Sequence, residues 1–339
     1  GPRGGARGRP LPAAASLARA RDRRGRRAKA RQVRRALPAK WCGDIRATDD
    51  LEHERDTGGA RYHAVYLVPA DRPQRLHKLA ATLQRDAMQA SALLEASYGR
   101  AIRFDMGTRC GPQYLDISVV RMPETVAALA ALASTETGTI DAVTRALRAH
   151  GFDASDGSDD WDLAAPRMRN FLGWLDGPGP HGACGQATLY GDSIRDQSNA
   201  NNQGGRVALA FRAGRSFCGS NTVRHEIAHN LGALQQRAPH AFDGAHCDDA
   251  YEDTMCYSRA PRRSSGHYQS LFFDYGNDDY WDPPGGAPLP WWTVNLSRFV
   301  CPTPACNAPT AGPPPDASSR PGKSRRRGSP GRRSRARRS

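Results

Sequence analysis

Two histidines and a glutamate, in the order His-Glu-Ile-Ala-His at residues 225–229, constrain this chain more than any other feature. In a helix, His225 and His229 lie one turn apart on the same face, so their imidazoles can converge on one metal ion. Glu226 projects from beside them, where a carboxylate can act on a metal-bound water. Taken alone, the pattern could instead belong to a solvated helix face that binds no metal. Four of the ten histidines fall between residues 225 and 246.

The residues after this pattern strengthen the metal hypothesis. Gly232 follows His229 by three residues, where a helix can end in a left-handed turn. Farther on, Met255 lies in the sequence Asp-Thr-Met-Cys-Tyr. HExxHxxG followed by a turn that contains methionine resembles the metzincin zinc endopeptidases, and is similar to the secreted reprolysin-like or snapalysin-like peptidases of bacteria.

The resemblance implies a mechanism and a fold. One catalytic zinc ion would lie above Met255, which serves as a hydrophobic floor, and Glu226 would act as the general base. Tyr257 occupies the position where astacin-like and serralysin-like members carry a tyrosine that can reach the metal, so it would hydrogen-bond the oxyanion. By the same resemblance, the strand at residues 206–211 would lie at a sheet edge and pair with an extended peptide substrate.

The third zinc ligand departs from the family pattern. That pattern puts a histidine or aspartate three residues after the glycine, but this chain has Gln235, whose neutral amide is a poor zinc ligand. We prefer His246, because a disulfide between Cys247 and Cys256 would clamp its loop onto the Met-turn. His240, Gln235 and Asp243 follow, in that order.

Eight cysteines without a CxxC pair favour disulfides and an oxidising compartment over a zinc ribbon or thioredoxin-like fold. Two local pairings are predicted, Cys247 with Cys256 and Cys301 with Cys306. The alternative is a set of reduced thiols in a cytosolic protein. Residues 11–17 form only a short, weakly apolar run, so we expect neither a clear signal peptide nor a membrane span. The predicted location is therefore extracellular, inferred from the cysteines and the resemblance.

Charge divides the chain into three parts. Residues 1–40 hold 14 Lys or Arg against one acid, and residues 307–339 hold 10 against one. With a total of +15, residues 41–306 carry a net charge of −7. We predict basic disordered tails at residues 1–40 and 307–339, the second rich in proline, and a metallopeptidase domain at residues 41–306.

Strands and helices alternate before the histidine pattern, which predicts an α/β (α+β) fold. Strands are expected at residues 62–68, 102–104, 115–122, 170–175, 186–190 and 206–211, and helices at residues 71–99 and 139–150. By resemblance, a mixed twisted sheet and the active-site helix would lie above an irregular lower subdomain. Trp281, Trp291 and Trp292 are expected to cover the lower half of the cleft, and the alternative is that they form a pocket for a substrate side chain. Calcium is a further cofactor to consider, in the polar loop at residues 192–205 or the acidic, aromatic segment at residues 273–280.

The sequence therefore predicts a monomeric zinc-dependent endopeptidase that acts on protein or peptide substrates. One alternative is a non-catalytic, zinc-binding extracellular module, which would explain Gln235 as degeneration of the site. Another is a nucleic-acid-binding protein that uses the basic tails. No aromatic residue interrupts the arginines of the first tail, which disfavours base stacking there.

Overall fold

The computed structural model describes residues 40–43, 59–108, 110–135, 137–155, 167–213, 216–248, 250–257, 272–283, 285–303 and 306. The chain divides into two units, Gly1–Pro309 and Thr310–Ser339, and every described residue belongs to the first. Apart from Lys40, the two basic tails lie outside the described residues, so their disorder and the domain boundaries stay predictions.

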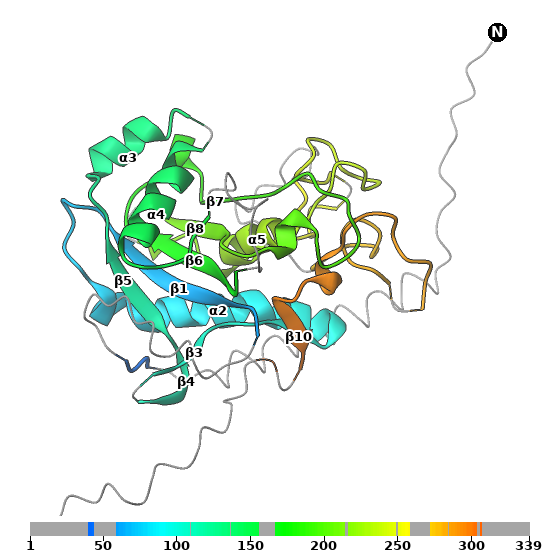
Figure 1. Ribbon diagram of the computed structural model, residues 1–339, viewed down its shortest axis with the longest axis horizontal. Coiled ribbons are helices and arrows are strands. Elements are labelled where there is room, and N and C mark those ends of the chain that lie inside the picture. The colour runs from blue at the N-terminus through cyan, green and yellow to red at the C-terminus, as the bar shows by residue number, and fades with distance from the viewer. Residues whose placement is uncertain are drawn as a thin grey trace, which may run out of the picture. The chain divides into compact units, whose positions relative to one another are not determined.

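A mixed sheet forms the centre of the first unit (Figure 1). Its strands lie in the order β5, β1, β6, β8, β7, and the first four run parallel to their neighbours. β7 runs antiparallel to β8 and ends this order, and the two-residue strand β9 also pairs with β8. The strands are β1 (Arg61–Val68), β5 (Ile117–Arg121), β6 (Arg169–Leu175), β7 (Gly185–Ala187), β8 (Val207–Ala213) and β9 (Ser216–Phe217).

Both faces of the sheet are covered, which explains why all eight residues of β1 are buried. Alternate β1 side chains enter two separate cores because successive residues of a strand point to opposite faces. Tyr62 and Tyr66 pack in one core with residues of helices α2 (Leu76–Tyr98) and α5 (Ser220–Asn230). Val65 and Leu67 pack in the other with residues of α3 (Val126–Leu132) and α4 (Gly138–Ala149). The sheet thus separates α2 and α5 from α3 and α4 (Figure 1).

The sequence correctly predicted an α/β fold and most of these elements. The predicted helix at residues 71–99 corresponds to α2, which begins later than predicted, at Leu76. It ends at Gly99, whose φ of 64° is the left-handed conformation that glycine adopts easily. α3 was missed, although Thr125 caps it by accepting a 3.2 Å hydrogen bond from the backbone N–H of Ala128. The predicted strand at residues 102–104 is shifted to β2 (Arg100–Ile102).

One prediction about the sheet was wrong. The strand at residues 206–211 corresponds to β8, which was expected at the sheet edge. β8 instead lies between β6 and β7, so its backbone is paired on both sides at Ala208, Leu209 and Ala210. Among the described strands, β7 occupies the position that the resemblance gave to residues 206–211.

The part of the chain after α5 is irregular. Its described residues contain only the short elements η5 (Val294–Leu296) and β10 (Val300–Pro302), and β10 pairs with β2. A second small pairing joins β3 (Met106–Thr108) to β4 (Gly111–Leu115). Trp281, Trp291 and Trp292 are buried here, as expected for residues that form the core of a region with little secondary structure.

Four disulfides cross-link the chain, and no free cysteine remains. The two predicted local pairs, Cys247–Cys256 and Cys301–Cys306, are both present. The others are Cys42–Cys110 and Cys184–Cys218. Four disulfides are consistent with an extracellular protein. Within the described residues, no helix combines the length and the apolar character that a membrane span requires.

Burial of Asp86 within α2 gives a testable pH dependence of stability. Only 9% of Asp86 is exposed, and desolvation raises its pKa to about 7 from 3.8. The folded state therefore binds more protons than the unfolded state between these values, so the unfolding free energy falls as pH rises through that window. We expect Asp86→Asn to be more stable than the parent at pH 8, by at most on the order of 4 kcal/mol.

The measurement is urea unfolding of both proteins, with disulfides intact, at pH 8 and at pH 4. The advantage of Asp86→Asn should shrink at the lower pH, where the parent carboxyl is protonated in the folded state. An advantage of equal size at both pH values would contradict the assignment.

Candidate metal centre

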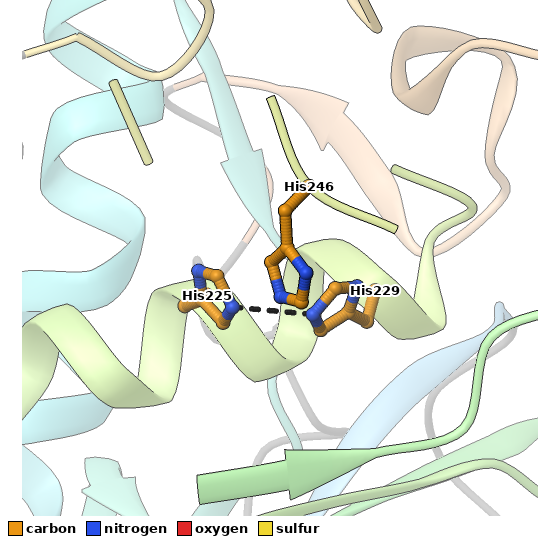
Figure 2. Close-up of side chains that lie close together, drawn as sticks. All are labelled: His225, His229 and His246. Carbon is orange, nitrogen blue, oxygen red and sulfur yellow. Dashed lines mark hydrogen bonds between the residues drawn. The ribbon is translucent and has the colours of Figure 1, made fainter. Parts of the chain in front are cut away.

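Helix α5 places His225, Glu226 and His229 close together and largely out of solvent, with 5%, 6% and 7% of each residue exposed. Its Val223 and Ile227, one turn apart, are buried in the core beside them. The histidine pattern therefore lies on a helix, as predicted (Figure 2).

Gly232 closes the end of α5, as predicted. Its φ is +94°, and a Cβ there would lie 2.4 Å from Cδ1 of Trp292. Trp292 in turn donates a 2.8 Å hydrogen bond from Nε1 to the carbonyl of Leu231. Glycine is therefore required here both by the backbone conformation and by the close approach of the indole ring.

Backbone carbonyls fix the orientation of both helical imidazoles. Nδ1 of His225 lies 2.7 Å from the carbonyl oxygen of Thr254, and Nδ1 of His229 lies 3.1 Å from that of Ala233. A carbonyl oxygen only accepts hydrogen bonds, so each Nδ1 carries the proton. Each neutral ring then presents a lone pair at Nε2, which is the form in which histidine binds a metal.

The two Nε2 atoms face each other at 3.1 Å (Figure 2). Desolvation is the main cause that lowers the pKa of His225 to about 4 and that of His229 well below its usual range, so both rings are neutral at neutral pH. Two lone pairs at this distance repel each other unless a cation lies between them. With metal–nitrogen bonds of about 2.0–2.1 Å, the nitrogens of a tetrahedral zinc site lie about 3.3 Å apart.

His246 completes a group of three imidazoles. One ring nitrogen from each of His225, His229 and His246 lies within 4.8 Å of the others. Figure 2 shows His246 approaching the two helical rings from the loop across from α5. Its Nδ1 donates a 2.8 Å hydrogen bond to Oδ2 of Asp243, which leaves Nε2 for a metal.

The loop that carries His246 is joined to the turn at Met255. Cys247 forms the disulfide with Cys256, and its N–H donates to the carbonyl of Met255 at 3.2 Å. Its own carbonyl accepts from the N–H of Tyr257 at 2.8 Å. These three links hold His246 beside the carbonyl of Thr254, and therefore beside the ring of His225.

Glu226 meets the edge strand of the sheet. A Cβ built on Gly185 of β7 would lie 2.3 Å from Oε1 of Glu226, so the β7 backbone passes directly over the carboxylate. A side chain at residue 185 would therefore require the Glu226 carboxylate to move from this position. Desolvation raises the pKa of Glu226 well above its usual range, which makes this group a stronger base than a solvated carboxylate.

Tyr257 and Met255 follow Thr254, whose carbonyl orients the ring of His225. The Tyr257 hydroxyl lies 3.2 Å from Nε2 of His225, while 49% of the residue is exposed. Burial of the hydroxyl region and the charges of Glu226 and Asp243 raise the pKa of Tyr257 to about 12, so it remains a hydrogen-bond donor. Met255 is completely buried.

The other three residues considered as the third ligand have different contacts. The side-chain amide of Gln235 is 3% exposed and donates to the backbone carbonyls of Gly232 and Tyr190, at 2.9 and 3.2 Å. Nδ1 of His240 lies 3.1 Å from both carboxylate oxygens of Asp279, within a different group that also includes Asp278. Asp243 contacts His246 and does not belong to the group of three imidazoles.

Neither segment considered for calcium is tested by this structure, so calcium stays a prediction. In the loop at residues 192–205, the Asp192 carboxylate accepts from the backbone N–H groups of Ile194 and Ala200. In the segment at residues 273–280, one Asp274 oxygen accepts from the N–H groups of Tyr280 and Trp281. Both carboxylates thus help to shape their own loops.

Sequence reasoning missed the groups that orient the imidazoles. Thr254 and Ala233 act through backbone carbonyls, which any residue supplies, so no side-chain signal marks them. The importance of Gly185 comes from its contact with Glu226, which is distant in sequence, so the local sequence does not reveal it. Asp243 left a recognisable local signal, because an aspartate three residues before a histidine can accept from both its backbone and its ring.

The comparisons with known proteins add no assignment. No model of a protein family matches this chain, and no curated protein is a significant relative.

Replacing single histidines tests which residues hold a metal. We expect His246→Ala to bind zinc at least about 100-fold more weakly than the parent, since it removes a ligand and even supporting residues change affinity by up to that amount. His240→Ala should bind zinc like the parent, because that ring pairs with Asp279. Zinc affinity is measured by competition with a chromophoric chelator. The opposite ranking would assign the third ligand to His240.

The disulfide next to His246 gives a second test. Replacing Cys247 and Cys256 together by serine should weaken zinc binding, because the loop would lose its covalent link to the turn at Met255. The control is serine at Cys301 and Cys306, which form the other short-range disulfide, beside β2. Equal loss of affinity in both double variants, by the same chelator competition, would show that general destabilisation is responsible.

Proposed function

We propose that this protein is a zinc-dependent endopeptidase. The observation that carries the proposal is the pair of neutral imidazoles on α5 whose Nε2 lone pairs face each other at 3.1 Å, with a third imidazole beside them. A dication between these nitrogens would turn the repulsion into coordination. Three imidazoles suit zinc, and catalytic zinc sites have three protein ligands and one open position.

His225, His229 and His246 would hold the ion. Once bound, zinc supplies a Lewis acid that polarises a peptide carbonyl and lowers the pKa of water to about 7. The proton transfers and the stabilisation of the oxyanion would be carried out by side chains of this chain.

Glu226 would take a proton from the attacking water and return it to the departing amine. Its carboxylate lies beside the two helical ligands and has a raised pKa, which favours proton acceptance. A nearby dication favours the ionised carboxylate, so the group would be available as a base when the metal is present.

Tyr257 would stabilise the oxyanion. Its hydroxyl remains protonated and lies 3.2 Å from Nε2 of His225, one of the nitrogens that would hold the ion. Because half of the residue is exposed, the tyrosine borders the accessible side of the centre. A preorganised donor at such a position stabilises the charge that develops on oxygen.

The edge strand β7 offers a binding site for the substrate main chain. The strand order ends at β7, whose Gly185 lies over Glu226, so an extended peptide added to this edge would pass the catalytic carboxylate. A pocket lies beside β7, lined by residues of β7, of η3 (Pro180–Gly182) and of the segment after α3. Its lining residues are Ala133, Ser134, Thr135, Pro180, His181, Gly182, Ala183, Gly185 and Gln186.

Membership of the metzincin group and secretion belong to the same proposal. Its support is the sequence HExxHxxG, the buried methionine of the later turn, the tyrosine two residues after it, and the set of disulfides. The third ligand would be supplied by His246 from a disulfide-linked loop, in place of the position that Gln235 occupies.

The decisive test compares the full chain with Glu226→Gln on a mixture of unfolded protein substrates. We expect the parent to bind about one zinc ion and to cleave the substrates. Glu226→Gln should keep the zinc while its rate falls by about 10²–10⁴-fold, the usual contribution of a general base.

Three other outcomes have distinct meanings. Equal turnover by both proteins would exclude Glu226 as the base. Zinc in both without cleavage by either would favour a non-catalytic zinc-binding module. Absence of zinc from the parent, even after incubation with excess zinc, would refute the metal centre itself.

A further inference from the structure

The three imidazoles differ in what holds their Nδ1 atoms. His225 and His229 lie on a regular helix and donate to backbone carbonyls. His246 lies in a loop and donates to a side chain, the carboxylate of Asp243, at 2.8 Å. Asp243 is therefore the only one of these three acceptors that acts through its side chain.

Asp243 holds His246 through both of its carboxylate oxygens. Oδ1 accepts from the backbone N–H of Ala245 at 2.9 Å and from that of His246 at 2.7 Å. Oδ2 accepts from the ring. A backbone hydrogen bond from Phe242 N–H to the carbonyl of His246, at 3.0 Å, closes the same turn. One oxygen thus shapes the turn while the other directs the imidazole.

We propose that Asp243 is the positioning residue of the third metal ligand, because its carboxylate fixes both the direction of the His246 ring and the tautomer that leaves Nε2 able to bind zinc. The inference rests on the metal centre proposed above. It assigns no contact between Asp243 and the metal or the substrate.

The tautomer argument follows from the hydrogen-bonding capacity of a carboxylate. An ionised carboxylate only accepts, so it holds the proton on Nδ1 of His246 and leaves the lone pair on Nε2. A histidine ligand that donates its other N–H to a carboxylate is also a more basic ligand, and loss of such a partner typically costs 10–100-fold in metal affinity.

Asp243→Asn separates positioning of the ring from shaping of the turn. The amide oxygen can still accept from the two backbone N–H groups, which fixes its NH2 group in the place of Oδ2. That NH2 group would then face Nδ1 of His246, which favours the tautomer with the proton on Nε2. The turn would be retained, but the ring could no longer coordinate zinc without giving up this arrangement.

The experiment measures the zinc affinity of the full-length parent, Asp243→Asn and Asp248→Asn by competition with a chromophoric chelator. Asp248 is an exposed acid in the same loop, two residues after His246, so its replacement removes the same charge. We expect Asp243→Asn to raise the Kd for zinc by about 10–100-fold. Asp248→Asn should change it by less than about threefold, in line with the small effects of exposed charges.

Two further readouts distinguish positioning from a structural role. The Tm of metal-free Asp243→Asn should equal that of the metal-free parent, since the turn is kept. Nitrogen NMR of the metal-free proteins should show the Nδ1–H tautomer of His246 in the parent and the Nε2–H tautomer in Asp243→Asn.

Several results would overturn the inference: unchanged zinc affinity in Asp243→Asn, an equal loss in Asp248→Asn, a matching fall in the metal-free Tm, or the Nδ1–H tautomer in both proteins. If the parent binds zinc and Asp243→Asn binds it weakly but the parent hydrolyses no peptide, the positioning role stands and the proposed peptidase activity fails. A parent that binds no zinc refutes both.

Discussion

The arrangement at the candidate metal centre depends on where the Nδ1 protons of the three histidines are held. Each Nδ1 donates to a different acceptor: the carbonyl of Thr254 before Met255, the carbonyl of Ala233 after α5, and the carboxylate of Asp243 in the third-ligand loop. These anchors direct the Nε2 atoms toward one point. The helix alone would place two histidines on one face, but it would not fix the tautomer or the ring angle that coordination requires.

Disulfides connect the segments that supply these groups. Cys184 directly precedes β7, and Cys218 lies two residues before α5, so their disulfide ties the strand over Glu226 to the start of the helix that carries it. Cys247–Cys256 ties the third-ligand loop to the turn at Met255 on the other side of the centre. Because the described residues after α5 contain little regular structure, covalent links replace the backbone ladders that would otherwise limit their movement.

The parts of the fold that were predictable from sequence are those with local causes. Strand β1 and helix α2 have clear periodicity, and Gly99 and Gly232 mark ends where the backbone takes a positive φ. Strand order has no such local cause. The run at residues 206–211 reads equally well as an internal or an edge strand, and the pairing of Gly185–Ala187 with β8 decides between them. Helix α3 was missed because it is only seven residues long, although its Thr125 cap and its alanines and leucines favour a helix.

The distinction between local and tertiary causes also applies to the candidate site, whose third imidazole comes from a loop. His225 and His229 follow from helical spacing alone, whereas His246 is brought to them across 17 residues by a disulfide and by Asp243. Gln235 lies at the position where the resemblance expects a ligand. Its amide instead donates to the carbonyls of Gly232 and Tyr190, which joins the end of α5 to the segment that contains Tyr190. A ligand at that position would be held rigidly by the helix end, so moving the ligand into a loop requires added constraints. The disulfide supplies the covalent constraint, and the Asp243 carboxylate supplies the one that orients the ring.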